Sequence, residues 1–66
     1  MITICMTNGG MYSNLNSINK CDVSEIKHEI ITEILENDKF MHITLNNGGQ
    51  KAILRVSCIS SINLIE

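Results

Sequence analysis

Five of the seven acidic side chains of this 66-residue chain fall in one short stretch. They are Asp22, Glu25, Glu29, Glu33 and Glu36. On a helix, where each residue advances by about 100°, all five would project from one side over roughly 21 Å of its length. Such a row of carboxylates can bind a basic protein surface, and it can imitate a nucleic-acid strand. The spacing predicts a recognition surface rather than a reactive centre.

The charge of the chain is divided between its segments. Residues 22–38 have a net charge of −5, the rest of the chain has +3, and the whole chain carries −2. Glu25, Glu29 and Glu33 follow one another at i, i+4 spacing, where each like-charge pair costs roughly 0.2–0.5 kcal/mol. Two interpretations stay open. The ridge is a solvated face that keeps a small protein in solution, or it meets a basic surface on a target protein or on a second copy of the chain.

A second group of residues alternates along a predicted hairpin over residues 40–56. Its members are Phe40, His42, Lys51, Ile53 and Arg55. They would share the face turned away from the core, where Phe40 and Ile53 are too apolar for a fully hydrated surface. Three interpretations stay open. A curled sheet covers these residues within one copy of the chain, the face forms a contact between copies, or it belongs to a site for a small anionic ligand such as a nucleotide, with Phe40 stacking on it.

The apolar residues between these groups predict a helix over residues 22–36. They are Val23, Ile26, Ile30, Ile31, Ile34 and Leu35. Their spacing is helical, Asp22 is a preferred N-cap residue, and Glu25 three positions later completes a capping box. Such a helix would bury Ile26, Ile30 and Ile34 and leave the acidic residues on its flank.

Residues 1–18 predict a β-hairpin with a two-residue turn at Asn8 and Gly9. In that register Met6 faces Met11, Ile4 faces Ser13 and Ile2 faces Leu15. The buried face would comprise Ile2, Ile4, Met6, Met11 and Leu15.

Residues 40–65 predict a second hairpin around Asn47 and Gly48, followed by one more strand. Met41 would lie opposite Leu54 and Ile43 opposite Ala52. A break at residues 60–61 would precede a last strand over residues 62–65. The predicted fold is a single α+β domain over residues 1–66 with the order ββ-α-ββ(β), in which one amphipathic helix packs on a small antiparallel sheet. A domain of about 60 residues buries only about 60% of its unfolded surface, so a homo-oligomer is expected.

Several classes of function are disfavoured. There is no phosphate-binding loop, dinucleotide motif or nucleophile elbow, so an enzyme is not expected. Cys5, Cys21 and Cys58 have no metal-ligand spacing, so we expect no metal, no cofactor, and free thiols in the cytoplasm. No apolar run is long enough to cross a membrane.

The sequence therefore predicts a small, non-enzymatic interaction protein that self-associates. It would bind, and by binding inhibit, a partner with a basic surface, as small phage or mobile-element proteins do. The alternative is an oligomeric protein that binds a nucleotide-like ligand between subunits. A nucleic-acid binder of the Sm or OB type is disfavoured. Five Lys and Arg side chains are few for binding along a phosphate backbone, and two aromatic side chains are few for stacking on nucleotide bases.

Overall fold

One α-helix and seven β-strands make up the fold of residues 2–65, which are the residues that the computed structural model describes. The strands are β1 (Ile2–Met6), β2 (Met11–Tyr12), β3 (Leu15–Ile18), β4 (Cys21–Asp22), β5 (Phe40–Leu45), β6 (Gln50–Arg55) and β7 (Ile59–Leu64). The helix α1 spans His28–Asn37, and single 3-10 turns at Val23–Glu25 and Val56–Cys58 precede α1 and β7. The predicted α+β class, with one helix packed on antiparallel strands, is confirmed.

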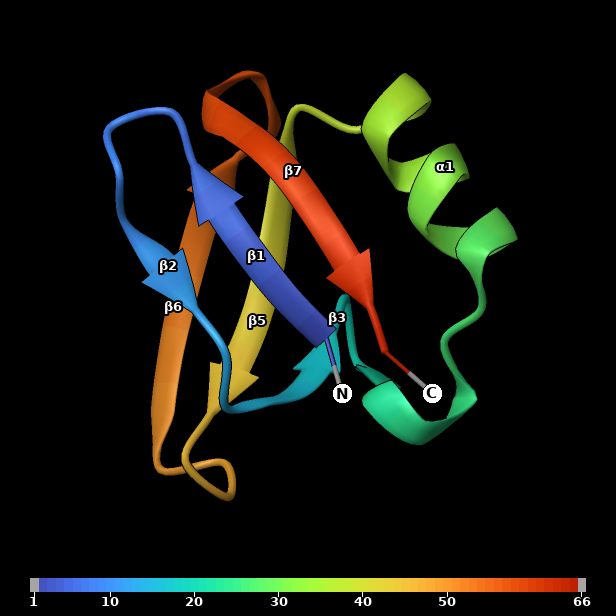
Figure 1. Ribbon diagram of the computed structural model, residues 1–66. Helices are drawn as coiled ribbons and strands as arrows, with labels where there is room; N and C mark the ends of the chain where they lie inside the picture. Colours follow the sequence, from blue (N-terminus) through green and yellow to red (C-terminus); the bar gives the residue numbers. More distant parts are fainter. Residues whose placement is uncertain (1, 66) are drawn as a thin grey trace.

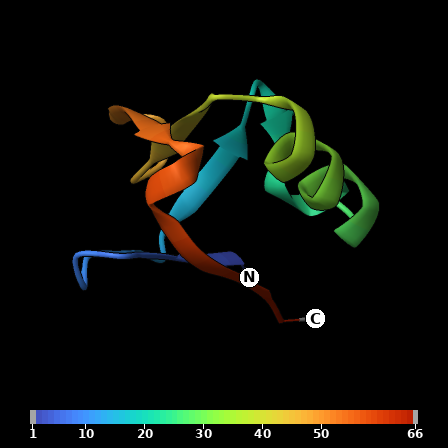
Figure 2. The same ribbon diagram turned by 90° about the horizontal axis from the view of Figure 1, so that it is seen from above.

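The strands divide between two antiparallel sheets that pack face to face (Figures 1 and 2). One sheet has the strand order β2-β1-β7, and the other has the order β4-β3-β5-β6. The largest fully buried side chains come from both sheets and are Ile4, Ile18, Met41 and Ile43. Helix α1 lies along one side of the sheets, and its Ile31 and Ile34 join the same core. The sequence predicts a single sheet, whereas the chain crosses between two, at residues 13–14 and again at the 3-10 turn Val56–Cys58.

The hairpin formed by β5 and β6 has the predicted register. Met41 lies opposite Leu54, and Ile43 lies opposite Ala52. Because side chains alternate between the faces of a strand, Met41, Ile43 and Leu54 point into the core while their neighbours point outward. This confirmed register decides which residues can form the outer surface described below.

The first hairpin differs from the predicted one by a single residue in register. Cys5 lies opposite Met11, and Ile4 lies opposite Tyr12 rather than Ser13. The loop has three residues instead of two, because the Met6 N–H donates to the Gly10 carbonyl. In the loop only Gly9 has a positive φ, of 92°, as in a type I turn followed by a left-handed glycine. A one-residue slip moves side chains to the other face, so Met11 is exposed and the prediction that it is buried is wrong.

Leu15 is buried as predicted, but in a different sheet. The second strand of the first hairpin ends at Tyr12, and the chain then passes to the other sheet. Leu15 begins β3, where it lies opposite Leu45 and not opposite Ile2. The predicted pair between Leu15 and Ile2 is therefore wrong, although both side chains belong to one core.

The predicted helix over residues 22–36 is wrong in its first part. Asp22 caps the 3-10 turn Val23–Glu25, where its Oδ1 accepts hydrogen bonds from both the backbone N–H and the hydroxyl of Ser24. Ile26 and Lys27 are extended, and α1 begins only at His28. Local side-chain bonds of this kind compete with helix formation, and the extended step lets Ile26 enter the core.

The end of the chain also differs from the prediction. β7 continues through residues 60–61, where a break was expected, but its pairing with β1 is irregular there: Cys5 lies opposite Ser61 and Met6 opposite Ile59, so Ser60 has no opposite residue. The 3-10 turn Val56–Cys58 separates β6 from β7. β7 pairs with β1, so that Ile2 lies opposite Leu64. Within residues 2–65, no helix has both the length and the apolar character needed to cross a membrane.

Candidate binding surfaces

The structure separates the five predicted acidic residues into two groups, and all five are exposed. Three remain on α1 at i, i+4 and i+7 spacing, on the side opposite the buried Ile31 and Ile34. These three are Glu29, Glu33 and Glu36, and we call them the acidic face of α1. Asp22 and Glu25 lie at the preceding 3-10 turn, beyond the extended residues 26–27. A single helical ridge of five carboxylates is therefore wrong.

The two acidic groups have different electrostatic surroundings. At the 3-10 turn, the backbone N–H of Ser24, and then its hydroxyl, donate to Asp22 and lower the pKa of that carboxyl below its ordinary value of 3.8. On α1 only Glu29 lies in the first turn, near the positive end of the helix dipole. The last turn of α1 contains no basic residue to offset the carboxylates nearest its negative end. Of the acidic face of α1, only Glu29 is thus stabilised by its own helix terminus.

The outer face of the β5–β6 hairpin is placed as predicted. It consists of three cross-strand pairs, Phe40 with Arg55, His42 with Ile53, and Thr44 with Lys51. Phe40 is 48% exposed and Ile53 is 64% exposed, so neither is covered by another element of the described chain. The guanidinium carbon of Arg55 lies 5.9 Å from the centre of the Phe40 ring, which is within cation–π range. Apolar and cationic side chains therefore share one exposed surface.

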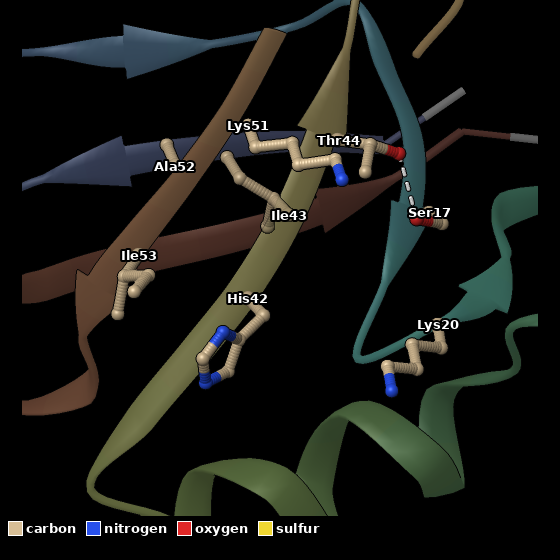
Figure 3. Close-up of a pocket in the computed structure, with 8 residues that line it drawn as sticks. All are labelled: Ser17, Lys20, His42, Ile43, Thr44, Lys51, Ala52 and Ile53. Carbon is tan, nitrogen blue, oxygen red and sulfur yellow. Dashed lines mark hydrogen bonds between the residues drawn. The ribbon is translucent and has the colours of Figure 1, made fainter.

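A depression of about 550 Å³ lies on this outer face (Figure 3). It is lined by Ser17, Lys20, His42, Ile43, Thr44, Lys51, Ala52 and Ile53. Lys51 extends across β5 toward Thr44, while His42 and Lys20 lie toward the other end. No carboxylate lines this depression. Asp38 lines two neighbouring hollows, one at the Phe40 and Arg55 end and one that shares Lys20 and His42 with the depression.

The position of Lys20 is set by a tight turn that is bonded to β5. Ile18 pairs with Cys21, so Asn19 and Lys20 form a two-residue loop, with φ of 50° and 67°. Glycine is preferred at the second position of such a turn, and an L-residue in this conformation costs about 1 kcal/mol relative to it. The Asn19 N–H donates to the His42 carbonyl at 2.7 Å, and the His42 N–H donates to Asn19 Oδ1 at 2.9 Å. The backbone of Lys20 is thereby held beside His42.

Two hydroxyl groups meet at the edge of the depression. Ser17 Oγ and Thr44 Oγ1 are 2.7 Å apart, so one of them donates its proton to the other (Figure 3). Each hydroxyl carries a single proton, and the hydroxyl that accepts this bond keeps its own proton for another partner. The pair can therefore offer one hydrogen-bond donor to a ligand seated between Lys51 and Lys20.

The remaining reactive residues do not form a cluster. Cys5, Cys21 and Cys58 are free thiols, and Cys58 is exposed. Among residues 2–65, no three His, Cys, Asp or Glu side chains lie close enough to hold a metal ion. The Thr32 hydroxyl donates to the His28 carbonyl within α1, which is an ordinary helix back-bond.

The sequence predicts the outward position of three residues that line the depression, His42, Lys51 and Ile53, but it does not place Ser17 and Lys20 beside them. Lys20 was missed because an Asn-Lys pair lacks the glycine that marks most two-residue turns. Comparison of the chain with protein-family models, with curated proteins and with solved structures found no match.

Proposed function

We propose that this chain is a small, non-enzymatic interaction protein that associates through the outer face of β5–β6. The observation that carries the proposal is the exposure of Phe40 and Ile53 on one ordered sheet face, beside Arg55 and Lys51. Aromatic residues and arginine are enriched in the centres of protein interfaces. Burying what remains exposed of Phe40 and Ile53 would contribute on the order of 1–2 kcal/mol for each side chain.

The partner that we propose is a second copy of the chain. The outer face carries Lys51 and Arg55, with Lys20 at its edge, whereas the acidic face of α1 carries three carboxylates. Because the two charged surfaces lie on different elements, copies can associate head to tail, with the acidic face of one copy on the outer face of the next. Association would also supply buried surface that a domain of this size lacks. The three free thiols support a reducing compartment such as the cytoplasm.

Sedimentation velocity over a range of protein concentrations tests this proposal. Ile53→Thr keeps a β-branched residue in the strand but makes the outer face more polar, so we expect weaker association. Met11→Thr is the matched control, because Met11 is 65% exposed but lies on β2 in the other sheet. A monomeric wild-type protein at every concentration, or equal loss in the two variants, would overturn the proposal.

A second candidate function is the binding of a different protein with a basic surface through the acidic face of α1. It is favoured by three glutamates that stay aligned and exposed although their mutual repulsion destabilises the helix. An oligolysine peptide is a suitable probe, and its binding should weaken as salt is added. Glu29→Lys should reduce this binding more than Glu25→Lys, which changes the net charge equally but lies outside α1. Equal reductions would show that net charge, and not the helix face, governs binding, and would remove this candidate.

A further inference from the structure

We infer that the depression on the outer face binds the phosphate group of a small organic phosphate, with the apolar part of the ligand against Ile53. This inference concerns a ligand site within one copy of the chain and does not depend on association between copies.

The charge of the depression favours an anion. Lys51 lines one end of it, Lys20 and His42 line the other end, and no acidic side chain among residues 2–65 lines it. This local excess of positive charge occurs in a chain whose net charge is −2. Two ammonium groups and a nearby hydroxyl suit an anion with several acceptor oxygens, and phosphate offers more of these than a carboxylate does.

The backbone at Lys20 gives independent support. The second loop position has a φ of 67°, where glycine would be more stable, yet the residue there is a lysine whose side chain lines the depression. Asn19 is hydrogen-bonded to both the N–H and the carbonyl of His42, so the backbone of the neighbouring Lys20 is held beside β5. The turn therefore presents Lys20 to the depression at a conformational cost that a glycine would avoid.

The hydroxyl pair and the exposed Ile53 side chain define the class of ligand. Ser17 and Thr44 leave one O–H donor for a phosphate oxygen, close to where Lys51 extends. Ile53 supplies the apolar side chain of the outer face, whereas Ile43 and Ala52, which also line the depression, form a cross-strand pair on the inner register. A volume of about 550 Å³ lies within the range of sites for small molecules, which are mostly apolar with a few well-placed polar groups. A nucleoside monophosphate has the required combination of phosphate, apolar surface and size.

The test is a heteronuclear NMR titration with adenosine monophosphate, inorganic phosphate and adenosine. We expect adenosine monophosphate to give saturable shifts at Lys20, His42 and Thr44, with weaker binding of inorganic phosphate and none of adenosine. Lys20→Gly should weaken the binding of adenosine monophosphate by about fivefold or more, because it removes one charged donor. The same substitution should raise the melting temperature, because it relieves the unfavourable φ.

Asn47→Gly is the matched control, since Asn47 also has a positive φ, of 59°, but lies in the loop between β5 and β6 and does not line the depression. It should raise the melting temperature and leave the affinity unchanged. Unchanged affinity in Lys20→Gly would overturn the inference, as would adenosine that binds as tightly as its monophosphate. Shifts caused only by a single-stranded oligonucleotide would overturn the small-ligand class. Sedimentation of the same samples reports association separately, so either proposal can fail without the other.

Discussion

Asn19 and His42 hold each other through two hydrogen bonds, one from each backbone N–H. The Asn19 N–H donates to the His42 carbonyl at 2.7 Å, and the His42 N–H donates to the Asn19 side-chain oxygen at 2.9 Å. This arrangement fixes the β3–β4 turn against β5, although the turn contains no glycine and has two residues with positive φ. The position of Lys20, and so the shape of the proposed binding depression, depends on it.

Substitution of Asn19 should therefore destabilise the protein. Asn19→Ala removes the acceptor for the His42 N–H and puts a less tolerant residue at a φ of 50°. We expect the free energy of unfolding, measured with urea, to fall by about 1–2 kcal/mol. Asn63→Ala, on the exposed side of β7, should change it by no more than about 0.5 kcal/mol. Equal effects would mean that the bond from the His42 N–H to Asn19 Oδ1 does not stabilise the turn.

The two faces of the β5–β6 hairpin should respond differently to the loss of one methyl group. Ile43 is fully buried, whereas Ile53 is exposed on the outer face. Ile43→Val should lower the free energy of unfolding by about 0.5–1.5 kcal/mol through lost burial and a small cavity. Ile53→Val should have almost no effect on an isolated copy. A comparable loss at Ile53, measured at concentrations where the protein is monomeric, would contradict the assigned faces.

Asp22 should make stability depend on pH in the acid range. Because hydrogen bonds from Ser24 lower its pKa in the folded state below 3.8, its contribution to stability is fully present above that value. The contribution is lost as the pH falls through the folded-state pKa. We therefore expect the difference in urea midpoint between wild type and Asp22→Ala to shrink as the pH is lowered from neutral to below 3.8. A difference that stays constant or grows with acidity would contradict this account of the turn.

The sequence was sufficient to predict the β5–β6 hairpin. The alternation of apolar and polar side chains along its strands and the Asn-Gly turn specify the same register there. The first hairpin carries the same turn signal, but an Asn-Gly pair fits both a two-residue turn, in which both residues have a positive φ, and a three-residue loop, in which only the glycine does. At Asn8 and Gly9 the glycine alone does so, and the register moves by one residue.

The start of the helix was not predictable from periodicity. Ile26 and Ile30 are four residues apart, as on a helix, but Ile26 enters the core from an extended segment. The bonds between Asp22 and Ser24 at the start of the 3-10 turn are local, and capping rules assign Asp22 equally well to either helix type. Because of this break, only three of the five carboxylates of the predicted ridge lie on α1, and Asp22 and Glu25 lie at the 3-10 turn.

A charge-exchange experiment tests the proposed head-to-tail association most directly. One variant reverses the acidic face with Glu29→Lys and Glu33→Lys, and a second reverses the outer face with Lys20→Glu and Lys51→Glu. In sedimentation velocity at low salt, each variant alone should remain monomeric, because its two surfaces then carry like charges. An equimolar mixture should associate again, since each surface of one variant meets its complement on the other. A mixture that stays monomeric while the wild-type protein associates, or variants that associate as the wild type does, would contradict the proposal.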